Sequence, residues 1–386
     1  MKEILGEKIP IKMWLDALDE STLRQTRNLA NLPCAFHHVA IMPDAHTGYG
    51  MPIGGVLAVC NAVIPNAVGV DIGCGMVAAR SSLREINTET LKKIMADARR
   101  EIPVGFNHRD QALSHCMMPA QKISDSMRVT AREYESARHQ LGTLGGGNHF
   151  IEIQRADDNA VWCMIHSGSR NIGKQVADHY NRLAKDVRAQ YQLSIPPEYD
   201  LAYFPLDSRE ADAYIKEMEY CLGFARANRA CMMNILQSIV TRHTGAAFEP
   251  SIDIHHNYAQ QETHFCREVM VHRKGATSAR AGQMGIIPGS QGAASYIVQG
   301  KGNRDSFYSC SHGAGRKMGR KQAQRELDLT HERAALDKKG ILHCLRSSKD
   351  LDEAAGAYKD IEEVMAHQRD LVEIVVRLQP LAVIKG

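Results

Sequence analysis

No apolar run in this 386-residue chain reaches the roughly 20 residues that a membrane-spanning helix needs. The first residues, Met1 to Lys8, mix charged and apolar side chains and contain nothing like the apolar segment of a secretion signal. Hydrophobic residues make up 44% and charged residues 24% of the chain, which is typical of a soluble globular protein. We therefore expect a cytoplasmic protein that does not enter a membrane.

The chain also lacks a large charge imbalance and a disulfide framework. Its formal net charge is only +3, so a nucleic-acid site would have to come from local clustering of basic residues. The ten cysteines never form Cys-x-x-Cys, and Cys60 and Cys163 lie in apolar runs, as reduced core cysteines do. Cys74 is the exception, because it lies between two glycines and three residues after Asp71.

The apolar pattern predicts helices and strands that alternate without a regular βαβ repeat. Helices are predicted at 14–32, 88–100, 120–140, 172–190, 208–243, 316–338 and 350–367. Strands are predicted at 36–42, 53–60, 66–80, 149–153, 161–166, 266–272, 283–287, 294–299, 306–311 and 372–384. No low-complexity linker divides the chain. The prediction is a single α+β domain over residues 1–386, with mixed sheets, surrounding helices and a helical lobe that could lie within 172–250.

One segment places a histidine where a ligand could bind. Its sequence is Ser306-Phe-Tyr-Ser-Cys-Ser-His312-Gly-Ala-Gly-Arg316-Lys-Met-Gly-Arg320, which predicts a strand that stops at the histidine and a helix that follows. The glycines would let a ligand approach the backbone, and a helix N-terminus favours an anion. Arg316 and Arg320 would lie on one helical face and could both point at phosphate. The residues alone leave two interpretations open: a nucleophilic or acid/base His312 beside a phosphate pocket, or a histidine that only caps a strand.

Five potential metal ligands also lie in turn-like settings. Glycines flank Asp71 and Cys74, so the chain could curl and bring both side chains to one point. His149 follows three glycines, and His166 and His256 each end an apolar stretch. Each histidine taken alone is more often a structural residue than a ligand. Together, oxygen, sulfur and imidazole suit a borderline divalent cation, and a shared thiolate or carboxylate could hold two.

The sequence around His312 resembles that of RtcB-type RNA-splicing ligases, in which this histidine carries a covalent guanylate. Other stretches match the same family in the family's order, and the C-terminus also fits. They are Pro43-Asp-Ala-His-Thr-Gly-Tyr-Gly50, Val70-Asp-Ile-Gly-Cys-Gly75, Gly145-Gly-Gly-Asn-His-Phe-Ile-Glu152, Ile165-His-Ser-Gly-Ser-Arg-Asn171, His255-His-Asn-Tyr258 and Val383-Ile-Lys-Gly386. The resemblance runs from about residue 10 to the last residue. An ordered set of this kind is far more specific than one Gly-rich motif.

The resemblance implies an RtcB-like fold and a metal site. The family's ligands match all five candidates, and its metal is Mn(II), with two ions bridged by the residue that corresponds to Cys74. Zinc would compete on affinity grounds. We interpret Asp44 as the carboxylate that holds the far ring nitrogen of His312 and keeps the attacking nitrogen unprotonated. The alternative is a simple turn aspartate in Pro-Asp-Ala-His.

The resemblance also implies a guanine-nucleotide pocket. Glu152 would accept from the N1–H and amino group of guanine, Asn148 would bind ribose or phosphate, and Lys385 would reach the nucleotide from the end of the last strand. The full set is Asn148, His149, Phe150, Ile151, Glu152, Pro288, Gly289, Ser290, Gln291, Ser295, His312, Gly313, Ala314, Gly315 and Lys385. Two positions depart from the family's pattern, since Gln291 replaces a common methionine and Gly319 a common serine.

The implied activity is RNA ligation in splicing or repair. GTP would guanylylate His312, the guanylate would pass to an RNA 3′-phosphate, and a 5′-hydroxyl would then seal the strand. Ends with a 2′,3′-cyclic phosphate would be opened first. The implied partners are such RNAs and an archease-type activator, and we expect a monomer. The rival interpretations are a metal-dependent phosphodiesterase acting on RNA ends and a non-enzymatic RNA-end-binding protein with a structural metal.

Basic residues near these motifs are the candidate RNA contacts, because phosphate contacts give affinity without sequence choice. We expect only Arg170 and Arg316 to contribute, since most of the other charges are expected to be solvated surface. The full set is Arg170, Lys174, Arg273, Lys274, Arg280, Lys301, Arg304, Arg316 and Arg320.

Overall fold

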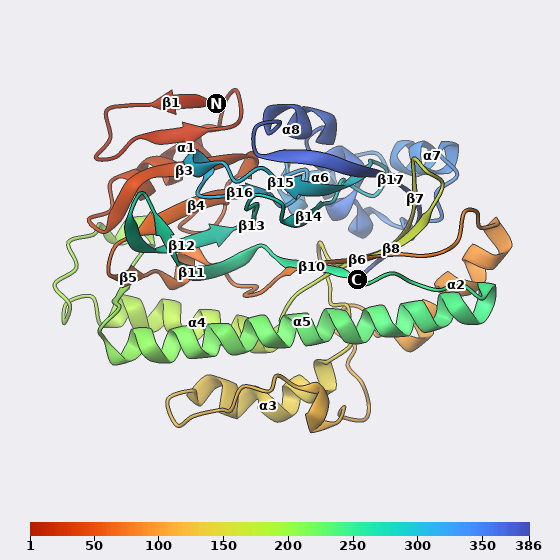
Figure 1. The fold of residues 1–386 in the computed structure, drawn as a ribbon, viewed down its shortest axis with the longest axis horizontal. Coiled ribbons are helices and arrows are strands. Elements are labelled where there is room, and N and C mark those ends of the chain that lie inside the picture. Colours follow the sequence, from red (N-terminus) through yellow and green to blue (C-terminus); the bar gives the residue numbers. More distant parts are fainter.

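The computed structural model describes residues 1–386, and most of its strands form two large sheets (Figure 1). The strands of the first sheet are β1 (Lys2–Ile4), β2 (Ile11–Met13), β3 (Ala35–His46), β4 (Ile53–Val59), β11 (Asn257–His264) and β12 (Arg267–Lys274). They are arranged in the order β1-β2-β3-β4-β12-β11. Only β2 and β3 run parallel; the other pairs of this sheet are antiparallel.

The second sheet is wholly antiparallel. Its strands are β6 (Gly75–Arg80), β7 (Phe150–Ala156), β8 (Val161–Ser167), β10 (Ile252–His255), β14 (Met284–Ile287), β15 (Ser295–Gly300) and β17 (Val372–Lys385). Their order is β10-β6-β8-β7-β17-β15-β14. Two short pairs complete the strands: β5 (Ala62–Val63) with β9 (Phe204–Pro205), and β13 (Ala276–Ser278) with β16 (Ser309–Ser311). Mainly antiparallel sheets with separate helices confirm the predicted α+β class.

The helices cover these sheets. They are α1 (Glu20–Ala30), α2 (Thr88–Glu101), α3 (Arg128–Gln140), α4 (Arg170–Asp186), α5 (Arg209–Thr244), α6 (Arg320–Glu326), α7 (Leu329–Lys338) and α8 (Ile361–His367). Figure 1 shows α5 as one long helix beneath both sheets, with α4 beside it and α3 on its outer side. None of the helices combines the length and the apolar character needed to cross a membrane.

The unbroken helix α5 connects the cores of the two sheets. Phe224, in its first half, packs in the same apolar cluster as Leu57 of the first sheet and Val176 of α4. Leu236, in its second half, packs in a cluster with Ile165 of the second sheet. The predicted helical lobe therefore contains helices that are buried against both sheets. The assignment of 1–386 to one domain remains a prediction.

Several predicted boundaries were wrong because tertiary contacts decide them. The helix predicted from residue 14 begins at Glu20, since the Trp14 N–H donates to the Ile41 carbonyl (3.0 Å) and continues the path of β2 beside β3. Asp19 caps the helix by accepting from the Thr22 N–H (2.9 Å). The helix predicted from residue 120 begins only at Arg128.

The segment between β5 and β6 is not the strand that its apolar residues predicted. Pro65–Ala67 forms a 3-10 helix, and Gly69 and Gly73 both adopt positive φ values, of 97° and 74°. A chain with two such residues cannot continue an extended ladder, so it turns instead and delivers Cys74 to the first position before β6.

The helix predicted for 316–338 is in fact two helices, neither of which includes Arg316. Gly319 is extended (φ −64°, ψ 154°) and precedes α6, and Asp328 interrupts the run by capping α7 at the His331 N–H (2.7 Å). Arg316 instead forms an isolated β-bridge with Tyr358. The prediction that two arginines share a helical face directly behind His312 is therefore wrong, and so is the predicted anion site at that helix N-terminus.

Other differences lie in the last third of the chain. The strand predicted from residue 306 begins at Ser309, after a 3-10 turn at Arg304–Ser306. The helix predicted for 350–367 consists of 3-10 turns at Ser348–Glu353 and Ala355–Ala357, followed by α8. By contrast, the predicted final strand forms as β17 and reaches Lys385.

The unpredicted strands β10 and β11 explain where the site lies. β10 pairs with β6 in the second sheet, and β11 pairs with β12 in the first. His256 is the one residue between β10 and β11, so the chain crosses from sheet to sheet at this histidine. Cys74 directly precedes β6, and its carbonyl accepts from the His256 N–H (2.9 Å). The junction of the sheets thus brings two distant ligand candidates together.

Candidate active site

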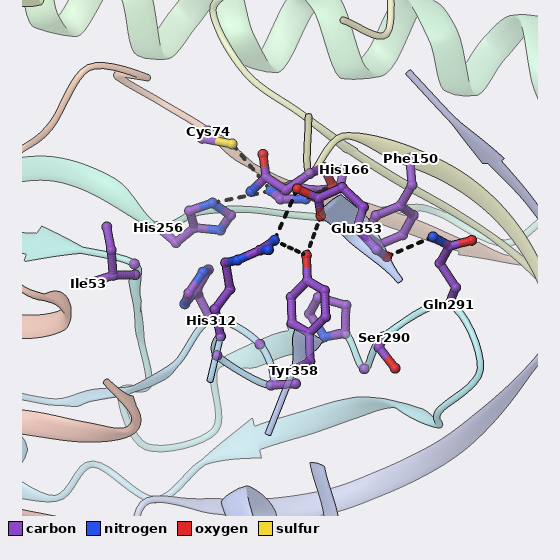
Figure 2. Close-up of a pocket in the computed structure, with 18 of the residues that line it drawn as sticks. Ile53, Cys74, Phe150, His166, His256, Ser290, Gln291, His312, Glu353 and Tyr358 are labelled. Atoms are coloured by element: carbon purple, nitrogen blue, oxygen red, sulfur yellow. Dashed lines mark hydrogen bonds and ion pairs between the residues drawn. The ribbon is translucent and has the colours of Figure 1, made fainter. Parts of the chain in front are cut away.

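A polar pocket of about 240 Å³ opens where the two sheets meet (Figure 2). Its walls come from widely separated stretches of the chain. Figure 2 shows Cys74, His166 and His256 together on one side, His312 beside them, and Ser290 and Gln291 across the pocket. The lining also includes Asn148, Phe150, Glu152, Pro288, Gly289, Gly313, Ala314, Gly315 and Lys385 from the predicted nucleotide set.

The five predicted metal ligands converge in two overlapping groups. The first group consists of Cys74, His166 and His256, with His166 Nε2 lying 3.2 Å from Cys74 Sγ and 3.3 Å from His256 Nε2. The second consists of Asp71, Cys74 and His149, with His149 Nε2 lying 3.0 Å from Asp71 Oδ2 and 3.5 Å from Cys74 Sγ. Cys74 belongs to both groups, which is the position that a bridging ligand requires.

The protonation states of the candidate ligands are compatible with a bound metal cation. His166 Nδ1 lies 3.1 Å from the Asn148 carbonyl oxygen, which can only accept, so Nδ1 carries the proton and Nε2 presents a bare lone pair. Burial lowers the pKa of His166 and of His256 well below the usual value, which keeps both rings neutral. Burial, reinforced by Asp71, raises the pKa of the Cys74 thiol well above its usual value. These lone pairs and this thiol face one another, and a divalent metal ion would be a cation that all of them could bind.

His312 is held by a buried carboxylate. Asp44, which is fully buried, accepts from the His312 and Gly313 backbone N–H groups (3.1 and 3.3 Å) and lies 2.6 Å from His312 Nδ1, all through Oδ2. Because the carboxylate accepts at Nδ1, the other ring nitrogen, Nε2, keeps its lone pair in the neutral ring. The ring centroid lies 4.8 Å from that of His256. The contact that we predicted between Asp44 and His312 is present, and its catalytic role stays a prediction.

Two neighbours that the sequence did not reveal fix the position of Asp44. Lys359 Nζ donates to the Pro43 and Ala45 carbonyls (3.2 and 2.6 Å), which flank the aspartate on both sides. Gly315 has a φ of 74°, and a Cβ there would lie 2.1 Å from the Asp44 carbonyl oxygen. The glycine therefore permits the close approach of the His312 turn to β3.

Glu152 lines the pocket and is almost fully buried (3% exposed). It accepts from the Gln154 side chain (2.6 Å), which also donates to Ser295 Oγ (3.0 Å). Burial raises the pKa of Glu152 to about 8. Ile151 alternates to the other face of β7 and packs in the core, so its side chain does not reach the pocket. Ser295 likewise lies behind the pocket wall rather than on it.

Glu353 is the functional candidate that sequence reasoning missed. Its carboxylate lies 3.2 Å from both Arg316 Nη1 and Arg320 Nη2, 3.6 Å from Lys385 Nζ, and also accepts from the Tyr358 hydroxyl. One buried acid thus holds three cations in the pocket wall. Glu353 and Tyr358 follow no motif, so no sequence signal indicated them.

The departure from the family's pattern at Gln291 has a structural role here. Its side-chain Nε2 donates to the Glu353 carbonyl (2.7 Å). A methionine at this position could not make that bond. Gln291 therefore fixes the backbone of the residue that collects the three cations.

The structure corrects several of the predicted RNA contacts. Arg273 is fully buried and paired with Glu262, and Lys274 is buried and donates to the Tyr49 and Asn66 carbonyls (2.6 and 3.0 Å). Neither side chain can reach an RNA phosphate, so these two predictions were wrong. Arg170 donates inside the protein, to Thr143 and to the Gly105 carbonyl (3.2 and 3.3 Å).

Comparison with known proteins adds independent evidence. The sequence model of the family described as tRNA-splicing ligase RtcB matches residues 25–386. The chain belongs to the RtcB family. It is 39% identical, over an alignment 410 positions long, to the RNA-splicing ligase RtcB of Escherichia coli K12, with 98% of each chain covered.

More distant relatives also match over nearly the whole chain. The tRNA-splicing ligase RtcB of Pyrobaculum aerophilum is 32% identical, covering 98% of this chain and 95% of the relative. The RNA-splicing ligase RtcB of Mycobacterium tuberculosis is 31% identical, covering 94% of this chain and all of the relative. The RtcB-like fold expected from the motifs therefore extends over the whole chain.

Proposed function

We propose that this protein joins RNA 3′-phosphate or 2′,3′-cyclic phosphate ends to 5′-hydroxyl ends in RNA splicing or repair, through a guanylate carried on His312. The observation that carries the proposal is the buried Asp44 carboxylate at His312 Nδ1, beside a cluster of five metal-ligand candidates. The family's relatives, which are named RNA-splicing or tRNA-splicing ligases, support the same reaction class.

His312 acts first as a nucleophile. Its Nε2 lone pair attacks the α-phosphorus of GTP, the N–P bond forms, and pyrophosphate leaves. Asp44 fixes the attacking tautomer and stabilises the positive charge that develops on the ring. A phosphate oxygen at the RNA 3′ end then attacks the guanylate and frees His312. The RNA 5′-hydroxyl finally attacks the activated 3′-phosphate, the strand is sealed, and GMP leaves.

The metal candidates complete this chemistry. Mn(II), held by Asp71, Cys74, His149, His166 and His256, would neutralise the phosphate charge and act as a Lewis acid, with Cys74 shared if two ions bind. In the same pocket Glu152 accepts from guanine, Asn148 binds ribose or phosphate, and Lys385 reaches the nucleotide from the end of β17. Partners are RNAs with the stated ends, and we also expect an archease-type activator and a monomeric enzyme.

Protein labelling tests the proposal directly. The protein is incubated with Mn(II) and with GTP that carries ³²P in its α-phosphate, and label on the protein is then measured. Label that survives alkali and is lost in acid indicates the expected phosphoramidate. Absence of label with every divalent metal, together with opening of RNA cyclic phosphates, would instead establish a metal-dependent phosphodiesterase.

The preference for guanine should depend on pH through Glu152. With its pKa raised to about 8, this carboxyl is mostly protonated at pH 6. Guanine offers two donors that need an ionised acceptor, so guanine binding favours loss of the proton. The affinity for GMP relative to AMP should therefore rise about tenfold per pH unit below 8 and level off above that pH. Calorimetric titration of metal-free protein with both nucleotides measures the ratio.

Glu152→Gln is the matched control for this pH dependence. It keeps the size of the side chain but cannot ionise, so its GMP-to-AMP ratio should be low and flat across the same range. A constant ratio in the wild-type protein would show that Glu152 does not contact the guanine edge.

Removing Lys385 and Gly386 should weaken GTP use. Lys385 ends β17, where it pairs with Phe150, and its Nζ lies 5.4 Å above the Phe150 ring and 3.4 Å from the Asn148 carbonyl oxygen. Loss of one charge-assisted contact should raise the GTP concentration for half-maximal labelling by roughly 10-fold or more. The labelling rate measured against GTP concentration gives this value.

Lys385→Met separates the charge from the strand end, because it keeps the chain length and the apolar stem. It should reproduce the effect of the truncation, whereas Lys338→Met, at an exposed position of α7, should have no effect. If the curves of the truncated and full-length proteins superimpose, Lys385 does not contact the nucleotide.

A further inference from the structure

A second groove, of about 890 Å³, adjoins the active-site pocket. It runs between the β3–β4 loop on one side and the segment 316–322 on the other. His46, Arg316 and Arg320 line both the groove and the pocket. A polymer that lies in this groove can therefore reach the surroundings of His312 without leaving the protein surface.

Uncompensated positive charge is the first property of this groove. Lys317 and Lys321 are exposed and form no ion pair, whereas Arg316 and Arg320 are paired with Glu353. The one acid in the lining is Asp19, and its carboxylate is engaged by the Ser21 hydroxyl and the Thr22 N–H (2.6 and 2.9 Å) at the start of α1. The two lysines are thus available to an anionic ligand.

An exposed aromatic ring is the second property. Tyr49 is 75% exposed, although its loop is anchored: its carbonyl accepts from Lys274 Nζ and from the Met51 N–H (2.6 and 2.8 Å). The preceding Gly48 exchanges two hydrogen bonds with the Gln25 side chain of α1 (2.6 and 3.1 Å). A fixed backbone therefore presents a flat apolar ring to solvent at the edge of a cationic groove.

We propose that this groove binds single-stranded RNA next to the end being joined, with phosphates on Lys317 and Lys321 and a base stacked on Tyr49. Cations that follow a backbone, combined with an aromatic platform, are the features by which proteins bind single strands without reading sequence. An acidic protein segment would satisfy the lysines but would leave the ring without a partner. The inference rests on the proposed function, because it assigns this surface to the substrate of the neighbouring site.

RNA binding and its salt dependence test the lysines. A fluorescent single-stranded RNA of about 12 nucleotides is titrated with wild-type protein and with a Lys317→Gln/Lys321→Gln variant at several salt concentrations. The variant should bind about tenfold more weakly at low salt, and its salt slope should fall by about 1.4, since each phosphate contact on a single strand contributes about 0.7. Lys92→Gln/Lys93→Gln in α2 removes the same charge outside the groove and should leave the slope unchanged.

The tyrosine is tested in the same titration. Tyr49→Ala should weaken RNA binding by roughly 5- to 100-fold, which is the range for loss of one stacked base, whereas Tyr49→Phe should bind like the wild type. Thermal unfolding of every variant checks that the fold is kept. Tyr49 and the lysines are surface positions, so midpoints should agree within about 2 °C.

Three results would overturn the inference. The first is unchanged affinity and salt slope in the lysine variant, and the second is an equal loss in the α2 control. The third is competition by polyglutamate that matches competition by RNA, with no effect of Tyr49→Ala, which would assign the groove to an acidic protein. Label uptake from GTP by the wild-type protein needs no RNA, so it tests the proposed function separately from the groove.

Discussion

His312→Ala should lose all protein labelling and all joining of 3′-phosphate to 5′-hydroxyl RNA ends. The substitution removes the one nucleophile that the protein itself supplies in the proposed reaction, and such a loss is on the order of 10⁴-fold or more. The fold should survive, because Asp44 keeps the two backbone N–H donors of this turn and the His312 side chain is half-buried rather than part of the core. Label incorporation and ligation of a defined RNA pair measure the effect.

The control is His331→Ala, which removes an exposed histidine of α7 whose ring makes no hydrogen bond. It should label and ligate like the wild type. A second ligation experiment uses RNA whose 3′-phosphate already carries the guanylate. His312→Ala should still seal this RNA, because the last step takes no nucleophile from the protein. A well-folded His312→Ala protein that still accepts label from GTP would refute the proposed intermediate.

Cys74→Ala should lose bound metal and labelling together. Cys74 is the member common to both ligand groups, so its removal weakens both at once. Substitution of residues that only support a metal ligand costs about 10–100-fold in affinity, and loss of the ligand itself should cost more than about 100-fold. Mn(II) content after dialysis, measured by plasma mass spectrometry, and label uptake at graded Mn(II) concentrations give the two readings.

Cys163→Ala is the matched control, because Cys163 is also fully buried and lies in β8, three residues before His166. It removes the same sulfur from the apolar core of the second sheet, with a comparable loss of packing. It should keep the metal content of the wild type. Unchanged Mn(II) occupancy in Cys74→Ala, or an equal loss in both variants, would count against Cys74 as a ligand.

The sequence alone predicted those helices and strands whose apolar residues follow a clear pattern along the element itself. The β-branched run of β4 and the long apolar run of β17 were predicted almost to the residue, because the apolar residues of each strand mark its extent. The amphipathic helices α2 and α4 were also found close to their observed bounds. The bounds of such helices and strands depend mainly on their own pattern of apolar residues.

The candidate ligands could be named from the sequence because each lies in a turn-like setting and matches a ligand position of the RtcB family, although each histidine taken alone is more often a structural residue. The residues alone did not show that these side chains converge, which only the resemblance to the family implied. His256 reaches Cys74 because it lies between β10 and β11, two partly polar strands that the sequence pattern did not predict. β10 forms because β6, far away in the chain, supplies its partner, whereas β11 pairs with the neighbouring β12 in a hairpin that joins the first sheet through β4.

The tertiary structure alone decided which charges are available to a ligand. Arg273 and Lys274 read as potential RNA contacts in the sequence, yet both are buried and satisfied inside the protein. Arg316 does not lie in the predicted helix, because Gly319 is extended and because Arg316 forms a β-bridge with Tyr358. Glu353, without any motif, collects three cations. The sequence determined the residues able to do the chemistry, whereas desolvation and pairing depend on neighbours distant in the chain, and only the fold assigns those neighbours.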